Sequence, residues 1–218
     1  MATKILTYNG SIVHSNDVVM SFTTSDAPQT TGNLVRFIDF DGTILKEQYV
    51  TTGQNATAPT LPTHDLLTFD EWNNAYDNIT HDLDVGATYY TTDGKTYLFM
   101  RITNTTGKKP TIYLNKADTS LMTVTWADGE TTTSSASGNV ALEKPNDYAV
   151  GDYAATIECV GNWSFYTYIF NSDVTYNSCL LKCYLSNRVT GIANAFYTCY
   201  SLSSIVIPDG VPGIGVLA

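Results

Sequence analysis

Residues 35–50, VRFIDFDGTILKEQYV, decide how the first half of the chain folds. Apolar and polar residues alternate from Leu34 to Ile38 and again from Ile44 to Val50, which is the pattern of strands with one buried face. Asp41-Gly42 lies between the two segments, and this dipeptide is a strong turn signal. The stretch therefore predicts a β-hairpin.

The same string contains D-x-D-G-T after an apolar strand and so resembles the active-site start of phosphotransferases of the haloacid dehalogenase class. That resemblance implies that Asp39 attacks phosphorus and that Asp41 handles the proton of the leaving group. Such chemistry needs the motif at the carboxyl end of a parallel strand that is followed by a helix. Residues 46–53 instead alternate as a strand and then break. We therefore expect no enzyme and keep the phosphatase as a remote alternative.

Composition favours strands over helices. The 218 residues are 43% hydrophobic and only 15% charged, and Thr, Tyr and Asn replace many of the usual charged residues. The net charge of −10 argues against nucleic-acid binding, which needs a basic surface. No apolar run has the roughly 18 residues of a membrane span, and residues 1–10 lack the features of a signal peptide. We expect no membrane insertion.

The remaining segments also predict short strands and turns. Asp93-Gly94 lies between tyrosine-rich segments and predicts a hairpin with Tyr97–Ile102 as its second strand. Leu121–Trp126 predicts a strand that ends at Asp128-Gly129, and further strands follow over residues 153–160 and 163–170. A single amphipathic helical turn or two is expected near Phe69–Ala75. The predicted fold class is all-β, made of tandem small β modules.

Three regions of the chain resemble known modules. The first continues the opening hairpin with G-x-x-A at Gly53 and Ala56, prolines at 59 and 62, and F-x-x-W at Phe69 and Trp72. This spacing resembles the Listeria–Bacteroides type repeat of internalin-B-like surface proteins, a small β-grasp-like module without enzyme activity. The resemblance implies that Asp41-Gly42 forms a turn while Val35 and Phe37 face the core.

The second region contains V-x-W-x-D-G around Trp126 and Y-x-x-G-D-Y from Tyr148 to Tyr153. It resembles β-sandwiches of the polycystic-kidney-disease (PKD) type, an Ig-like fold. Such modules act as spacers or as binding platforms, mostly in secreted or surface proteins.

The third region, from Ile192 to Ile214, resembles the BspA-like leucine-rich repeat. An internal echo lies about 22 residues earlier, because Leu180 and Leu185 align with Leu202 and Ile207. About three repeats are needed to bury a continuous core, and at most two are visible here. We therefore expect self-association through residues 180–218, a longer repeat array, or a cap from the preceding sandwich.

These patterns predict four parts in the chain. An N-terminal β segment covers residues 1–32, and a β-grasp-like module covers residues 33–91. A PKD-like sandwich then covers residues 92–164, and short leucine-rich repeats cover residues 165–218.

No metal site or cofactor is expected. Cys179 and Cys183 have poor spacing for zinc and no nearby His, so buried free thiols are favoured for them and for Cys159 and Cys199, with a disulfide left open. Four acidic residues could supply calcium ligands, but no loop has the required spacing, and solvated turn acids are favoured at all four. These residues are Asp39, Asp41, Asp82 and Asp84.

Aromatic residues provide the candidate contact sites. The three tryptophans, Trp72, Trp126 and Trp163, are expected to pack in or near cores rather than to stack on sugars. Tyrosines near turns are better candidates for an exposed adhesive or glycan-contacting face. The candidate ligand-contacting residues are Tyr166, Tyr168, Tyr197 and Tyr200.

The sequence thus predicts a non-enzymatic protein for surface display or adhesion, which binds a protein or glycan ligand on a cell surface. The alternative is a structural protein of a phage virion, a tail or fibre component for host attachment. Either function places the chain outside the cell, on a cell surface or in a virion.

Overall fold

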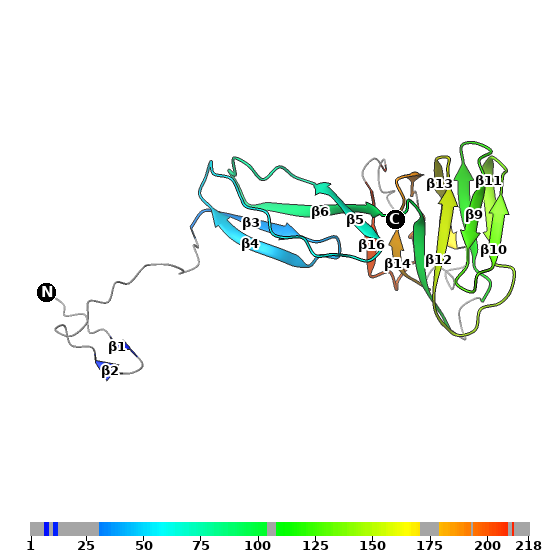
Figure 1. Cartoon of the computed structure of the whole chain (residues 1–218), viewed down its shortest axis with the longest axis horizontal. Coiled ribbons are helices and arrows are strands. Elements are labelled where there is room, and N and C mark those ends of the chain that lie inside the picture. Colours follow the sequence, from blue (N-terminus) through cyan, green and yellow to red (C-terminus); the bar gives the residue numbers. More distant parts are fainter. Residues whose placement is uncertain are drawn as a thin grey trace. The chain divides into compact units, whose positions relative to one another are not determined.

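The structure is a computed structural model that describes residues 31–103, 108–170, 179–192, 194–208 and 211, and the backbone of residues 7–8 and 11–12. The chain divides into two compact units, residues 1–30 and residues 31–218. The first unit contains the antiparallel pair β1 (Thr7–Tyr8) and β2 (Ser11–Ile12). All sixteen elements in the described residues are strands, so the predicted all-β class is confirmed (Figure 1).

The opening stretch forms the predicted hairpin. It consists of β3 (Asn33–Ile38) and β4 (Ile44–Val50), which pair antiparallel. The carbonyl of Asp39 accepts the N–H of Gly42 at 3.0 Å, and Gly42 has a φ of 88° that suits glycine. Val35 and Phe37 are fully buried, as predicted.

These strands belong to a four-stranded sheet, called the first sheet, with β5 (Leu67–Trp72) and β6 (Leu83–Thr91). The order is β4-β3-β6-β5, and the two central strands β3 and β6 run parallel. Residues 51–66 cross one face as an irregular loop. Gly53 and Ala56 hold this loop in place, because their N–H groups donate to the carbonyls of Ile79 and Tyr76, each at 2.8 Å.

The expected helical turn near Phe69–Ala75 is wrong, because residues 67–72 form the edge strand β5. The pairing with β6 shifts register between Phe69 and Trp72, which marks a β-bulge. Both rings pack on the core next to Leu67, Ala87 and Tyr89. The bulge thus produces the three-residue spacing of apolar rings that a helix would also give.

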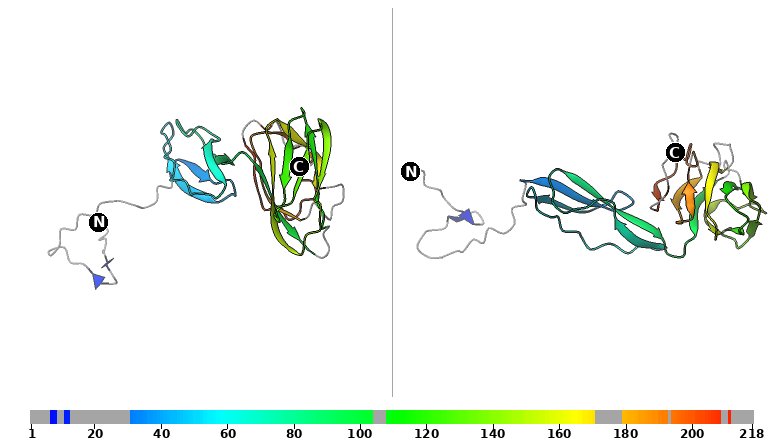
Figure 2. Two further views of the ribbon diagram at one scale, coloured as in Figure 1. Left: turned by 45° about the vertical axis from the view of Figure 1, so that its right-hand side comes forward. Right: turned by 90° about the horizontal axis from the view of Figure 1, so that it is seen from above.

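Residues 96–206 form two further sheets that face each other (Figures 1 and 2). The six-stranded sheet has the order β10-β9-β12-β7-β14-β16, and the four-stranded sheet has the order β11-β8-β13-β15. A single core of buried side chains lies between them. Their strands are β7 (Thr96–Ile102), β8 (Thr111–Lys116), β9 (Met122–Thr125), β10 (Thr131–Ser134), β11 (Gly138–Glu143), β12 (Gly151–Cys159), β13 (Trp163–Phe170), β14 (Leu180–Tyr184), β15 (Val189–Gly191) and β16 (Ser204–Val206).

Tryptophan and tyrosine side chains fix the loops of this sandwich. Trp126 and Trp163 are buried, while Trp72 is half-buried against Phe37, so all three tryptophans pack in or near cores as predicted. The hydroxyl of Tyr153 donates to the carbonyl of Ala149 four residues earlier, at 3.1 Å. A tyrosine hydroxyl that donates to a backbone carbonyl a few residues upstream is also a feature of Ig-like sandwiches.

The 22-residue offset of the echo in the sequence is also the offset at which two strands pair. β14 and β16 lie side by side and parallel, with Lys182 opposite Ser204 and Cys183 opposite Ile205. β14 also pairs with β7, and β15 pairs in parallel with β13. β14, β15 and β16 therefore extend the two sheets of the sandwich, and β13 runs across the predicted boundary between residues 164 and 165.

Asp93-Gly94 forms a turn but not the predicted hairpin. Gly94 has a φ of 73°, and its N–H donates to the carbonyl of Thr91 at 3.1 Å. The flanking strands pair with other partners, because β6 lies in the first sheet and β7 in the six-stranded sheet. The dipeptide therefore connects two sheets.

Candidate ligand-binding groove

Aromatic rings line the outer face of the six-stranded sheet. Leu98 and Met100 of β7 point inward and are fully buried, so Tyr97 and Phe99 point outward. Their rings stack at 6.3 Å with an interplanar angle of 17°, and Phe99 also meets the Tyr184 ring of β14 at 5.2 Å. The hydroxyl of Tyr97 donates to Asp93 at 2.7 Å, and burial together with this bond raises the pKa of Tyr97 to about 12.

A groove of about 520 Å³ lies over this face. Strand β7 contributes Phe99, β12 contributes Tyr153, and β14 contributes Tyr184. Asp65 and Leu66 come from the loop that precedes β5 and complete the lining. Residues from four separate segments of the chain thus meet in one concave surface.

Leu66 has an unusual backbone at the edge of this groove. Its φ of 69° lies in the left-handed region, which is strained for a large side chain. The carbonyl of Leu66 accepts the N–H of Thr92 at 2.9 Å, which holds this conformation. The leucine side chain is left 41% exposed. A strained, exposed apolar residue in a groove points to contact with a ligand rather than to packing.

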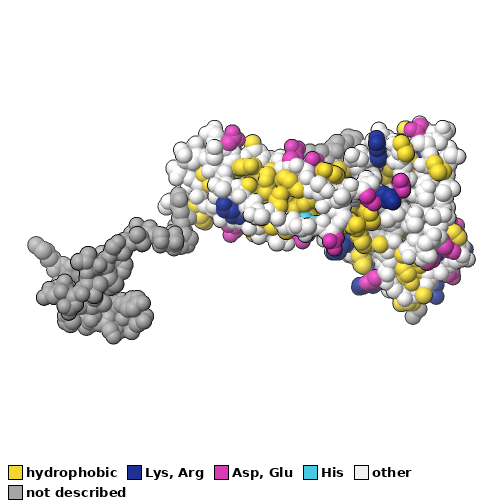
Figure 3. All heavy atoms as spheres, in the orientation of Figure 1, with side chains coloured by type: hydrophobic (Ala, Val, Ile, Leu, Met, Phe, Trp, Pro, Cys, Tyr) yellow, Lys and Arg dark blue, Asp and Glu magenta, His cyan; other side chains and the backbone are white. Residues whose placement is uncertain are grey.

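Charged groups of both signs border the groove. Arg101 binds Asp152 through two bonds, Nε to Oδ1 at 2.7 Å and a second guanidinium nitrogen to Oδ2 at 2.8 Å. These bonds hold the pKa of Asp152 below its usual value. Lys182 and Asp65 are exposed lining residues, and no ion pair within the described residues involves either of them. Over the face shown in Figure 3, charged side chains are scattered rather than gathered by sign.

The acidic residues of the D-x-D-G-T string differ in their surroundings. Asp39 is buried, and its carboxylate bonds to Nε2 of His64 at 2.8 Å and accepts the N–H of Phe40 at 2.8 Å. The expectation of a solvated acid is therefore wrong for Asp39, because the Phe40 and His64 rings cover it. Asp41 is an exposed turn acid that accepts the N–H of Thr43, and hydrogen bonds with Thr43 lower the pKa of Asp41.

Phe40 links the hairpin to the rings at the groove. Its ring lies 5.4 Å from Tyr89 and 5.9 Å from Tyr184. Burial, with a further contribution from Asp39, raises the pKa of Tyr89. Asp39 is therefore buried among aromatic rings. As the nucleophile of a phosphotransferase, it would have to be open to a phosphoryl group that arrives from solvent.

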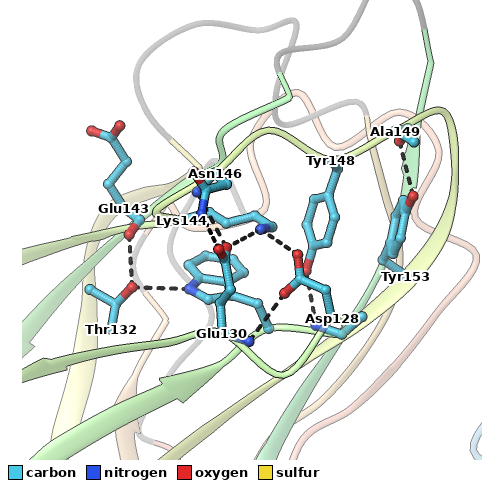
Figure 4. Close-up of polar contacts among 11 residues, drawn as sticks. Asp128, Glu130, Thr132, Glu143, Lys144, Asn146, Tyr148, Ala149 and Tyr153 are labelled. Atoms are coloured by element: carbon cyan, nitrogen blue, oxygen red, sulfur yellow. Dashed lines mark hydrogen bonds and ion pairs between the residues drawn. The ribbon is translucent and has the colours of Figure 1, made fainter.

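A second polar cluster joins the β9–β10 turn to residues 143–148 (Figure 4). The ammonium of Lys144 contacts Asp128 at 2.6 Å and also Glu130, and it lies 4.4 Å from the centre of the Tyr148 ring. The Lys144 side chain is 0% exposed. Glu130 also accepts hydrogen bonds from the side chain and the backbone N–H of Asn146. The cluster fastens the turn to the loop that follows β11.

The electrostatics of this cluster favour the charged forms. Burial opposes the ammonium of Lys144, but Asp128 and Glu130 together outweigh burial, so the pKa of Lys144 is raised. Hydrogen bonds from Lys144 lower the pKa of Asp128 and of Glu130. At neutral pH the amine therefore has no free lone pair with which to act as a nucleophile or base. The arrangement supports structure rather than chemistry.

The four tyrosines predicted to contact a ligand lie around β13 and residues 194–201. Tyr166, Tyr197 and Tyr200 are exposed, while Tyr168 is half-buried. The rings of Tyr168 and Tyr197 lie 5.6 Å apart, so the fold brings these two together. Contact with a ligand at this tyrosine surface stays a prediction.

The cysteines are all buried and free in the structure. Burial raises the pKa of Cys179 and of Cys199 to about 12, and it raises the pKa of Cys183 as well. Such thiols are poor nucleophiles. Within the described ranges, no group of three or more His, Cys, Asp or Glu side chains is placed to hold a metal ion.

Comparisons with family models, with curated proteins and with solved structures find no match to this chain. The described part of the chain has no helix with the length and apolarity of a membrane span. The surfaces of the molecule itself are therefore what indicate its function.

Sequence reasoning missed the groove, although one signal for it was present. The alternation in Tyr97–Ile102 predicts a strand, and it also places Tyr97, Phe99 and Arg101 on the face opposite the core. The positions of Leu66, Tyr153 and Tyr184 carry no such signal, because only the packing of distant segments brings them together.

Proposed function

We propose that this chain is a non-enzymatic binding protein for display outside the cell, on a cell surface or on a virion. The proposal joins a β-grasp-like module, a PKD-like sandwich and short leucine-rich repeats in one chain. The central parallel pair of the first sheet supports the first part, and the hydrogen bond from the Tyr153 hydroxyl to the Ala149 carbonyl supports the second. The parallel 22-residue offset between β14 and β16 supports the third.

The groove over the six-stranded sheet carries the proposal. It combines apolar rings with a few polar groups at its border, which is the usual make-up of a ligand site. Its rings are fixed by contacts with other rings, so little freedom is lost when a ligand binds. A binding site on a rigid β framework suits a protein whose function is to present that site to other molecules.

A binding assay tests this function. Fluorescently labelled full-length protein is applied to panels of bacterial and animal cells and to arrays of immobilised proteins and glycans. We expect retention on at least one surface, and we expect the double variant Leu66→Gly/Lys182→Gln to lose most of it. Wild-type protein that is retained nowhere would contradict the proposal, as would retention that the double variant leaves unchanged.

Self-association through residues 180–218 is a separate part of the proposal. β16 is the last strand of the six-stranded sheet, and an edge strand can pair with another chain. Light scattering coupled to size exclusion measures the mass directly. We expect a mass above that of one chain at high concentration, and a strict monomer would contradict self-association without affecting ligand binding.

A further inference from the structure

We propose that the groove binds a neutral carbohydrate, which rests on the proposed binding function and deepens it. The residues that carry the assignment are Leu66, Phe99, Lys182 and Tyr184, with Asp65 and Asp152 at the border. Three independent properties support this ligand class: the size of the groove, its aromatic lining and the balance of its charges.

The size of the groove fits a small ligand. Sites for small molecules typically occupy about 300–1,000 Å³, and this groove has about 520 Å³. A stable protein partner would need about 800 Å² of contact surface on each side, which a groove of this size alone does not supply. One or two sugar rings are therefore a better match than a protein helix or sheet.

The aromatic lining offers ordered ring faces. Phe99 is held between Tyr97 and Tyr184. Tyr153 lies opposite the fully buried Met100 and packs against the inner core, so the ring faces open to a ligand are those of Phe99 and Tyr184. The faces of such rings are electron-rich and attract the weakly positive C–H groups on one side of a sugar ring.

The charges at the border favour a neutral ligand. Lys182 offers N–H donors, while Asp65 and Asp152 offer oxygen acceptors. An anionic ligand would meet the two carboxylates, and a cationic ligand would meet Lys182 and the nearby Arg101. Sugar hydroxyls both donate and accept hydrogen bonds, so they can use all of these groups without a net charge.

Leu66 provides a variant that separates binding from folding. Glycine adopts a φ of 69° without strain, so Leu66→Gly is expected to keep or raise the melting temperature. The same change removes an exposed apolar side chain from the groove. Loss of such a contact should weaken binding by roughly tenfold.

The experiment uses the full chain and neutral oligosaccharides of two to six units: cello-, chito-, xylo- and manno-oligosaccharides. An array identifies a retained sugar, and calorimetry then measures its affinity for wild type, Leu66→Gly and Lys182→Gln. Lys108→Gln serves as the matched control, because Lys108 is an exposed lysine that does not line the groove. Tyr166→Ser tests the tyrosine surface in the same way.

The expected result is a roughly tenfold loss of affinity in Leu66→Gly, a loss in Lys182→Gln and no loss in Lys108→Gln. Sugar binding that is lost only in Tyr166→Ser would overturn the assignment to the groove. Retention on proteins or cells without retention on any of these sugars would overturn the carbohydrate assignment and leave the proposed function in place. Retention on no surface at all would overturn both.

Discussion

Two ion pairs of similar length have opposite surroundings in this protein. Lys144 meets Asp128 at 2.6 Å, and Arg101 meets Asp152 at 2.7 Å. The Lys144 side chain is 0% exposed, whereas Arg101 and Asp152 are 58% and 57% exposed. Distance alone therefore says little about what each pair does.

Burial decides the difference between the two. An exposed pair exchanges its partner for water at little cost, so Arg101 and Asp152 can contribute to ligand contact without a large effect on folding. A buried ammonium cannot recover its hydration, so Lys144 depends on its carboxylate partners. The pair formed by the buried Lys144 fixes a turn, and the exposed Arg101 pair stays available to the groove.

The largest effect is expected when Lys144 loses both carboxylates. The double variant Asp128→Asn/Glu130→Gln leaves the ammonium of Lys144 buried without a counter-charge. An uncompensated buried charge of this kind costs about 3–5 kcal/mol of unfolding free energy. Urea unfolding measures the loss, with the exposed Asp152→Asn as control. A double variant as stable as the control would show that water reaches Lys144.

Removal of Lys144 itself should cost less. Lys144→Met keeps most of the packing volume, and the carboxylates that remain are partly exposed to solvent. We expect a loss of about 1–2 kcal/mol in the same urea experiment, because no buried charge is left unpaired. The order of the two losses of unfolding free energy is the informative result. A larger loss in Lys144→Met than in the double variant would contradict the expectation that an unpaired buried ammonium costs more than partly exposed carboxylates without a partner.

Acid should weaken the same cluster. Lys144 lowers the pKa of Asp128 from its usual 3.8 and that of Glu130 from its usual 4.5. The folded protein then binds fewer protons than the unfolded chain, so this stability is present above about pH 4.5 and is lost as the pH falls through the folded-state pKa values. Unfolding free energies between pH 7 and pH 3 should fall more steeply for wild type than for Lys144→Met. If the unfolding free energies of wild type and Lys144→Met fell equally steeply with pH, the acid sensitivity would not come from this cluster.

The smallest effect is expected at the exposed pair. Arg101→Gln should shift the melting temperature by less than about 3 °C. Arg36→Gln is the matched control, because Arg36 forms the same two-bond pair with Asp84 at 2.7 and 2.8 Å, but Asp84 does not line the groove whereas Asp152 does. Both variants should fold alike, while only Arg101→Gln should alter ligand affinity. Equal ligand affinity in the two variants would show that the Arg101–Asp152 pair does not contribute to binding in the groove.

Local sequence signals predicted turns better than strand partners. Asp-Gly occurs between strands at residues 41–42, 93–94 and 128–129, and all three form turns with glycine at positive φ. Only the first and third join strands that pair with each other. At 93–94 the turn chemistry is the same, but each flanking strand finds a better partner elsewhere in the chain. Local residues fix a turn, whereas pairing depends on the whole sheet.

The candidate site was less predictable than the fold. The 22-residue echo can be seen in the sequence, and β14 and β16 pair at that offset. The burial of Asp39 and Lys144 has no local signal, because distant groups such as His64 and Glu130 supply the partners that make it tolerable. The left-handed backbone at Leu66 is similarly invisible, since nothing in the residue type favours it.

The parallel pairing of β3 and β6 has a mechanical consequence. The chain enters the first sheet at Asn33 and leaves it at Thr91, and these two ends lie at opposite ends of neighbouring parallel strands. A pulling force between them runs along the strands and loads their hydrogen bonds in shear, all at once, instead of opening them one after another. A tether that is held at one end and loaded at the other would draw its resistance from these two strands, and stretching of single molecules would register it as one abrupt rupture.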